Sequence, residues 1–344
     1  MMTSAPTQRS VLTALLLLGV VTGAAHDLWA QSRSVDELKD RYRRPQTVPF
    51  PDDNSFTQDR AELGKLLFFD PRLSASSLVS CATCHNPAFS WGDGLPKALG
   101  HGMRQLNRRT PTILNVAWAD ALFWDGRADT LEAQALGPIT SPDEMNLSSQ
   151  ELVERLKRVP RYVTLFRIAY PDENITPATV AKALATFERT VVSGIAPFDE
   201  WIGGSESAIS EQAQRGFVLF NTKANCAKCH RAWNFTDSGF HDVGVPTEDL
   251  GRGKHLPKLG GMQHAFKTPT LRNVNRRAPY MHNGSVATLR EVIDLYDTGG
   301  VARPSRSPDI RPLSLTSDEK EALIAFLKTL TSVDPPVCLP ELPR

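Results

Sequence analysis

The sequence predicts a mostly α-helical protein built from two similar halves. Helix start signals recur along the 344 residues, whereas the alternating apolar and polar pattern of a β-strand is scarce. Segment 110–115 is nearly repeated by segment 268–273, and each copy is followed at the same spacing by a glycine and then by Thr-Leu. Each half also carries a Cys-x-x-Cys-His motif upstream of its copy. Such internal similarity indicates duplication of one structural unit.

Capping signals predict two of the helices. Thr176 followed by Pro177 is typical of an N-cap and a first-turn proline, and predicts a helix from residue 178 to about 192. Thr316 and Glu319 form a capping-box pattern before an apolar run, and predict the helix that ends the globular part.

Two more helices are expected between these. Ser149 is expected to cap a helix that continues, past a proline, to Phe166, and residues 210–220 are expected to lead helically into the second motif. Proline and glycine are frequent in 85–115 and 231–305, which predicts long loops. Long loops suit a protein in which a bound group forms much of each core.

The Cys-x-x-Cys-His motif is the signature of covalent c-type haem attachment. Its two thiols add to the haem vinyl groups, and the adjacent histidine reaches the iron as proximal ligand. The two copies are Cys81-Ala-Thr-Cys84-His85 and Cys226-Ala-Lys-Cys229-His230. A zinc site would need two Cys-x-x-Cys pairs acting together, and a redox dithiol would stand beside a βαβ pattern, which is not visible. The sequence therefore predicts two cytochrome c-like domains, each with one covalently bound haem.

The N-terminus has the pattern of a secretory signal. Arg9 precedes an apolar run at 11–21, and small residues follow at 23–25. A signal peptide at residues 1–25 would direct the protein to the periplasm and then be removed. An uncleaved N-terminal anchor is the alternative. A second run long enough to span a bilayer is not visible, so no membrane span is expected after cleavage.

The predicted domains are an N-terminal haem domain at 26–200, a C-terminal haem domain at 201–335 and a tail at 336–344. Cys338 has no partner for an internal disulfide, and is expected to be a small buried apolar residue. The formal net charge of +1 argues against nucleic acid as a partner.

Several long segments resemble the bacterial di-haem cytochrome c peroxidases and the related MauG-type enzymes. The resemblance covers about residues 61 to 330. The matching segments are 64–74, 80–85, 123–128, 134–138, 144–145, 240–244, 267–273 and 278–285.

The resemblance implies a division of labour between the haems. The first, with His85 as proximal ligand, would be the peroxide site, and the second, with His230, would relay electrons. His101 matches the histidine that occupies the distal side of the first iron in resting peroxidases. Trp124 matches the tryptophan between the two haems.

The resemblance also implies a distal pocket at the first haem. Gln134 and Glu144 match its polar pair, and Pro138 lines it. Glu144 would be the general acid–base for peroxide, a role that needs a poorly solvated carboxylate. Outside the family pattern, Glu144 reads as a solvated loop charge, Gln134 as an exposed helix residue and Trp124 as a core aromatic. His101 lies between two glycines, which allow a mobile loop.

The distal ligand of the second haem departs from the peroxidase pattern. Di-haem peroxidases place a methionine there, whereas this sequence has Tyr296, as MauG-type proteins do. Tyr296 and Pro138 lie at nearly the same distance from their repeat segments, so both should face the distal side of their own haem. A phenolate favours higher iron oxidation states and predicts a low potential. The alternative is that Tyr296 packs in the core and that Met262 or Met281 is the ligand.

The resemblance leaves calcium open. Family members bind a calcium ion between the domains through an asparagine side chain and backbone carbonyls. The asparagine position is Arg109 here, and arginine has donors only. Asn107 could substitute after a small loop shift, and Pro279 remains as a carbonyl donor.

Three functions follow from these patterns. The first is reduction of hydrogen peroxide with electrons from a small periplasmic cytochrome c or copper protein. The second is a MauG-like oxidase that uses peroxide to modify side chains of a partner protein. The third is a di-haem electron carrier without catalysis. Glu144 and Gln134 argue against it, because a simple carrier needs no acid–base group in a distal pocket. Because di-haem peroxidases are often dimers, a homodimer is a further expectation.

Overall fold

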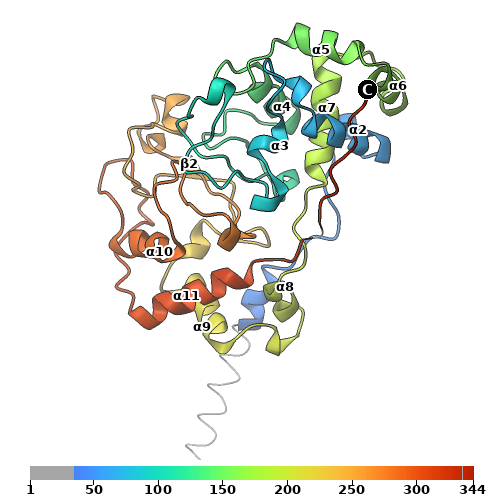
Figure 1. Cartoon of the computed structure of the whole chain (residues 1–344). Helices are drawn as coiled ribbons and strands as arrows, with labels where there is room; N and C mark the ends of the chain where they lie inside the picture. Colours follow the sequence, from blue (N-terminus) through green and yellow to red (C-terminus); the bar gives the residue numbers. More distant parts are fainter. Residues whose placement is uncertain (1–34, 335) are drawn as a thin grey trace, which may run out of the picture.

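The computed structural model describes residues 35–334 and 336–344, and is mostly α-helical (Figure 1). The expected signal peptide at 1–25 lies outside the described residues. Within the described part, no helix combines the length and apolar character needed to cross a membrane. The α-helices are α2 (Gln58–Phe69), α3 (Cys81–Cys84), α4 (Leu131–Thr140), α5 (Ser149–Lys157), α6 (Pro160–Ala169), α7 (Pro177–Arg189), α8 (Pro197–Ile202), α9 (Glu211–Asn221), α10 (Leu289–Thr298) and α11 (Ser317–Thr329).

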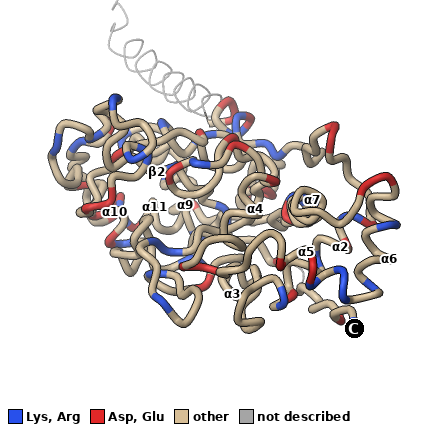
Figure 2. Tube along the Cα trace, turned by 90° about the horizontal axis from the view of Figure 1, so that it is seen from above, with Lys and Arg blue, Asp and Glu red and all other residues tan. Residues whose placement is uncertain are grey.

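Extended structure is small in the described chain. Strands β1 (Phe240–His241) and β2 (Phe266–Lys267) pair antiparallel. Short 3-10 turns and loops connect these strands and the α-helices. Acidic and basic residues are interspersed along the described part of the Cα trace (Figure 2).

The capping predictions hold for two helices and fail by one residue for a third, and the helix expected at 210–220 is also present. The Thr176 hydroxyl accepts from the Thr179 N–H at the start of α7, and Thr316 and Ser210 cap α11 and α9 in the same way. Ser148, and not Ser149, caps α5. The expected continuation to Phe166 is a separate helix, α6, because a proline at its first position keeps the preceding residue extended.

Two apolar cores organise the chain. The first is formed by buried residues of α2, α4, α5, α6 and α7, and the second by residues of α8, α9, α10 and α11. In Figure 1 the α2–α7 half lies above the half that holds α8, α9 and α11. The division of the chain at residue 200 stays a prediction, and each core draws most of its residues from one side of it.

The two ends of the described chain cross this division. Tyr42, from the start of the chain, is 2% exposed and packs in the second core against Phe198 and Phe217. Val337, from the tail, packs against the first core, and the tail runs back toward α6 in Figure 1. Each half therefore includes chain from both sides of residue 200.

The main helix pair of each half crosses at a glycine. A Cβ on Gly64 of α2 would lie 1.9 Å from the Ala183 carbonyl oxygen of α7. A Cβ on Gly216 of α9 would lie 1.9 Å from the Ala322 carbonyl oxygen of α11. Both crossings therefore need a residue without a side chain, and the two halves solve the same packing problem in the same way.

The repeat segments end in equivalent asparagines. Asn115 has φ of 60°, receives the Ser193 N–H on its side-chain oxygen at 2.9 Å, and donates its own N–H to the Val191 oxygen at 2.8 Å. Asn273 has φ of 56° and makes the same two bonds, at 2.8 and 3.0 Å, with residues just past α11. Each repeat is thus fastened to the end of its own long helix, as duplication predicts.

One prediction about the tail is wrong. Cys338 is exposed and not buried. It lies beyond the last helix, where the tail follows the surface of the first half and Val337 makes the apolar contact instead.

Candidate haem centres and peroxide site

Each Cys-x-x-Cys-His motif folds into a single tight turn. In the first, the His85 N–H donates to the Cys81 oxygen at 2.8 Å, and in the second the His230 N–H donates to the Cys226 oxygen at 2.9 Å. The turn brings both thiols and the imidazole to the cavity described below. This is the arrangement that attachment to one porphyrin edge requires.

Both imidazoles are set up as iron ligands. Nδ1 of His85 lies 3.2 Å from the Trp91 carbonyl oxygen, and Nδ1 of His230 lies 2.9 Å from the Phe235 oxygen. A carbonyl only accepts, so Nδ1 carries the proton and Nε2 keeps its lone pair for a metal. Burial lowers the pKa of each imidazole, which favours the neutral form that binds a metal.

A cavity of about 1600 Å³ lies between the halves and is lined by both motifs. Ordinary small-molecule pockets measure about 300–1,000 Å³, so this cavity exceeds the space that one ligand needs. Its volume and its two metal-ready imidazoles fit two haem groups.

The predicted distal pocket of the first haem is assembled in this cavity. Gln134 and Pro138 lie four residues apart on one face of α4, and both line the cavity. The loop after α4 folds back, because the Met145 N–H donates to the Pro138 oxygen at 3.0 Å. This fold brings Glu144 into the lining, close to the same helix face.

Glu144 has the electrostatics of an acid–base group. Burial raises the pKa of its carboxyl above the ordinary range, and Arg127 and the Ser141 hydroxyl oppose this rise. The carboxyl therefore exchanges its proton nearer to neutral pH than an exposed glutamate does. Its neighbour Asp143 is exposed and paired with Arg104.

His101 lies beside this loop but is not among the residues that line the cavity. Its N–H donates to the Asp143 oxygen at 3.0 Å, and its neighbour Gly100 packs so closely that a Cβ would lie 1.9 Å from the same oxygen. Its Nδ1 is buried without a hydrogen-bond partner in the described chain. The role of His101 as a distal ligand stays a prediction.

Trp124 connects the two halves. Its indole N–H donates to the Arg109 oxygen at 2.9 Å, and its carbonyl accepts the Lys267 N–H at 2.8 Å. The ring is 9% exposed and lines the cavity that holds both motifs. The role of Trp124 between the two haems stays a prediction.

Tyr296 is the structural counterpart of Pro138. Each is the eighth residue of the helix that follows its repeat, in α10 and α4, and each lines the cavity. Burial is the main cause that raises the pKa of Tyr296, and the nearby thiols of Cys226 and Cys229 raise it further. The phenol therefore lies close to the second motif. Of the alternative ligands, Met281 also lines the cavity and Met262 does not.

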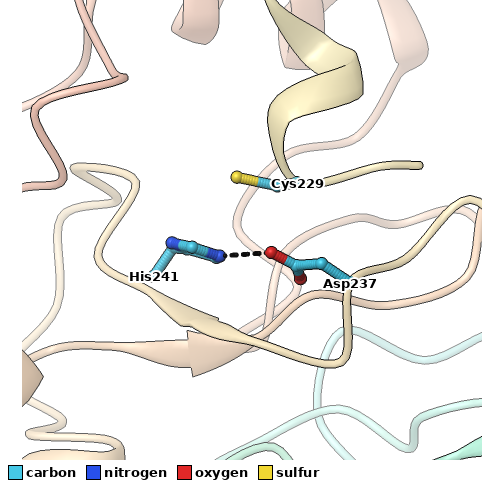
Figure 3. Close-up of side chains that lie close together, drawn as sticks. All are labelled: Cys229, Asp237 and His241. Atoms are coloured by element: carbon cyan, nitrogen blue, oxygen red, sulfur yellow. Dashed lines mark hydrogen bonds and ion pairs between the residues drawn. The ribbon is translucent and has the colours of Figure 1, made fainter.

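Three residues of the kinds that bind metal ions lie next to the second motif. Ligand atoms of Cys229, Asp237 and His241 lie within 4.8 Å of one another, and His241 Nε2 is 2.8 Å from the Asp237 carboxylate (Figure 3). Because Cys229 belongs to the haem-attachment motif, its sulfur is committed to a thioether. The remaining pair is an ion pair beside the second haem and not a separate metal site.

Calcium does not fit the residues present. Arg109, at the expected asparagine position, is 8% exposed and lines the cavity, and Arg277 lies close enough for the two charges to repel. Two guanidinium groups offer donors only and disfavour a second cation between them. Asn107 lines the cavity but is exposed.

The sequence analysis did not identify three charged residues of the cavity wall. They are Glu188, Lys267 and Arg277. Glu188 is 6% exposed, has a carboxylate oxygen without a partner in the described chain, and has its pKa raised by burial to about 8. An acidic residue on the apolar face of α7 was the one local signal, and nothing near it in sequence indicates the cavity.

Family models match most of the chain. Residues 58–207 match the model of the di-haem cytochrome c peroxidases, and residues 213–331 match that of cytochrome c. The methylamine utilization protein MauG of Methylorubrum extorquens is 53% identical over 317 residues, which cover 91% of this chain and 90% of that protein. The chain belongs to the di-haem cytochrome c peroxidase and MauG family.

Other family members agree with this assignment. The cytochrome c551 peroxidase of Nitrosomonas europaea is 36% identical over 83% of this chain and 84% of that protein. The crystal structure of a MauG-like protein associated with microbial copper homeostasis has a TM-score of 0.79 and 32% identity, and covers 84% of this chain and 95% of that one. The protein is therefore a di-haem oxidoreductase of the peroxidase type that carries two c-type haems.

Proposed function

We propose that this di-haem enzyme uses hydrogen peroxide to oxidise aromatic side chains of a partner protein. The observation that carries the proposal is Tyr296, which faces the cavity near the second motif where peroxidases place methionine. A phenolate donor stabilises high oxidation states of the second iron. Both sites could then share an oxidising equivalent, and the partner would not need to enter the cavity.

The first half carries the chemistry of peroxide. The first haem, when bound, supplies the iron at which the O–O bond is cleaved. Glu144 takes the proton from the inner peroxide oxygen and returns it to the outer oxygen, which leaves as water. Gln134, from the facing helix, orients peroxide through its amide. Over the whole reaction, hydrogen peroxide takes up two electrons and two protons and becomes two waters.

The electrons and protons come from the partner's side chains. Trp124 is held by one hydrogen bond to each half of the chain, and its oxidisable ring would act between the two haem sites. The signal peptide expected at 1–25 would direct the protein to the periplasm, where it would meet its partner. Coupling of two aromatic rings of the partner would release the two electrons and two protons that peroxide needs.

Reduction of peroxide with a small cytochrome or copper protein as donor is the second candidate. His101 favours it, because the residue is retained between Gly100 and Gly102, and Gly102 has φ of 63°. Such a loop can carry a ligand that leaves the first iron on activation. The carrier function without catalysis is disfavoured by Glu144, whose carboxyl lines the cavity.

Electron paramagnetic resonance of the purified holoprotein separates the two enzymes. The proposal expects the second haem to have a low potential and a His/Tyr spectrum, and peroxide to produce a long-lived oxidised state involving both haems. Mass spectrometry of a partner protein after peroxide treatment should show loss of two hydrogens per coupling. A His/Met spectrum with fast turnover of a reduced small cytochrome would contradict the proposal and favour the second candidate.

A further inference from the structure

Three cations of the cavity wall lack a carboxylate partner in the described chain and have a pKa lowered by burial. They are Arg109, Lys267 and Arg277. By contrast, Arg108 pairs with Asp125 and Asp249, and Arg127 pairs with Asp125. Lys97, Lys254 and Arg311 also line the cavity without such a partner, but the last two are exposed.

The three cations lie together at the boundary of the halves. The Arg109 N–H donates to the His282 oxygen at 2.9 Å, and the Lys267 N–H donates to the Trp124 oxygen at 2.8 Å. Both hydrogen bonds join one half of the chain to the other. The charge of Arg109 lowers the pKa of Arg277, and the charge of Arg277 lowers that of Lys267. Each cation is thus electrostatically coupled to the next.

Such a cluster needs anions. Arg109 and Arg277 are each 8% exposed, and the Nε of each is buried without an acceptor in the described chain. Burial is the main cause that lowers the pKa of Lys267 to about 8 and that of Arg277 to about 9. Buried like charges are costly unless an anion pairs with them, and a buried guanidinium with an unused donor is rare in native proteins.

The acidic groups that face the cluster do not neutralise it. Asp93 acts on Arg109, Asp120 and Asp237 act on Lys267, and Tyr280 acts on both arginines. Asp237 already pairs with His241 at 2.8 Å, and neither Asp93 nor Asp120 forms an ion pair with any of the three cations. A negatively charged group bound in the cavity would supply the missing partner.

Haem supplies such groups, because each haem carries two propionate carboxylates. We infer that Arg109, Lys267 and Arg277 bind the haem propionates that face the boundary between the halves, and that these fixed cations take the place of a divalent metal ion there. The inference rests on haem attachment and not on the oxidase function proposed above. Guanidinium groups suit this role because they bind carboxylates through two parallel hydrogen bonds.

The metal half of the inference is tested on the native holoprotein. After dialysis against a calcium chelator, metal analysis should find far less than one calcium per chain, and the haem absorption spectrum should be unchanged. Added calcium should give no binding heat. One tightly held calcium, or a spectrum that changes on chelation and recovers with calcium, would overturn this half.

The propionate half is tested by acid–base titration of the haem absorbance. A cation lowers the pKa of a neighbouring carboxyl by about one to three units, so its removal raises that pKa. R277Q and K267Q should each shift a titration step upward by about one pH unit or more. R277K should restore most of the native value, and K254Q, which removes an exposed charge at the cavity edge, should shift nothing.

Two outcomes of the titration would overturn the assignment. One is that R277Q and K267Q load haem and titrate like the native protein. The other is that inorganic phosphate shifts the native titration by competition, because the cluster then binds a free anion and not a propionate. If R277Q fails to take up haem, R277K and K267Q still decide the point.

Discussion

The two halves share one scaffold and differ at the residues that face the haems. Gly64 and Gly216, and Asn115 and Asn273, make the same contacts in each half. The eighth residue of the following helix is Pro138 in α4 and Tyr296 in α10. The proline side chain has no group that can bind iron, whereas the phenol oxygen of tyrosine can bind it. The comparison predicts that this position decides which haem keeps an open face.

A second difference lies on the long helix of each half. Counted from the alanine at each glycine crossing, Glu188 of α7 corresponds to Leu327 of α11, and both residues line the cavity. The first half therefore places two carboxyls, Glu188 and Glu144, at its haem, whereas the second places a leucine and a phenol. This difference predicts proton transfer in the first half and electron transfer in the second.

Loss of the Glu144 carboxyl should have the largest effect on this comparison. E144Q keeps the shape of the side chain but does not accept the peroxide proton, so the reaction with peroxide should slow by about 10²- to 10⁴-fold. Stopped-flow absorbance of the holoprotein measures the rate. D143N, which neutralises the exposed neighbour, is the control and should react at nearly the native rate. Equal loss in both variants would remove Glu144 from its role.

The same experiment has a defined pH dependence. Burial raises the pKa of Glu144, and the group acts as a base only when ionised, so the rate should fall as pH drops through that raised pKa. The inflection should lie above the ordinary glutamate value of about 4.3 and vanish in E144Q. A native profile without this inflection would contradict the assignment.

The glycine crossings test the shared scaffold. G64A and G216A each place a Cβ 1.9 Å from a backbone oxygen, so the helices must separate. Each variant should lose about 3 kcal/mol of unfolding free energy, near the upper end for overpacking. G260A, where a Cβ meets nothing within 4 Å, should change stability by less than about 0.5 kcal/mol. Denaturant unfolding of the three holoproteins measures this, and a marked difference between G64A and G216A would break the equivalence.

Replacement of Tyr296 should make the second half resemble a conventional peroxidase. Y296M offers a soft thioether in place of a hard phenolate, and should raise the potential of the second haem by on the order of 0.1 V or more. Spectroelectrochemical titration measures the shift. Y280F removes the hydroxyl of another cavity tyrosine, which donates to the Val274 oxygen at 3.2 Å, and should leave the potential unchanged. An unchanged potential in Y296M would favour Met281 as ligand.

Replacement of Glu188 should change the pH dependence of stability. Its pKa is about 8 in the folded protein and near 4.3 when unfolded. Between these values the folded state binds the extra proton, so stability falls as pH rises from about 4.5 to 8. E188L, which copies the second half, should flatten this slope. Thermal unfolding at several pH values measures it, and an equal slope in both proteins would contradict the assignment.

Local signals were enough for α7, α9, α11 and the haem motifs. Thr176 and Thr316 cap N–H groups only three residues away in the sequence, so a short segment is enough to predict their role. Two adjacent serines, Ser148 and Ser149, compete for one cap, and the sequence alone assigns the wrong one.

Contacts between distant segments were not predictable. Arg109, Lys267 and Arg277 come from three places in the chain, and their lack of carboxylate partners is visible only after folding. The exposure of Cys338 likewise depends on where the tail lies. The sequence analysis identified Glu144, Gln134 and Tyr296 through the family resemblance, since isolated residues of these types carry no signal of a shared cavity.

The crossing of the chain ends has a consequence for folding. The second core includes Tyr42, from before the first half, and the first core receives Val337, from after the second half. Asp334 joins both halves, because it accepts the Gly194 N–H at 2.9 Å and the Asn273 amide at 2.6 Å. Neither half can therefore complete its packing as an independent unit. A gene split at residue 200 would separate each core from one of its own segments.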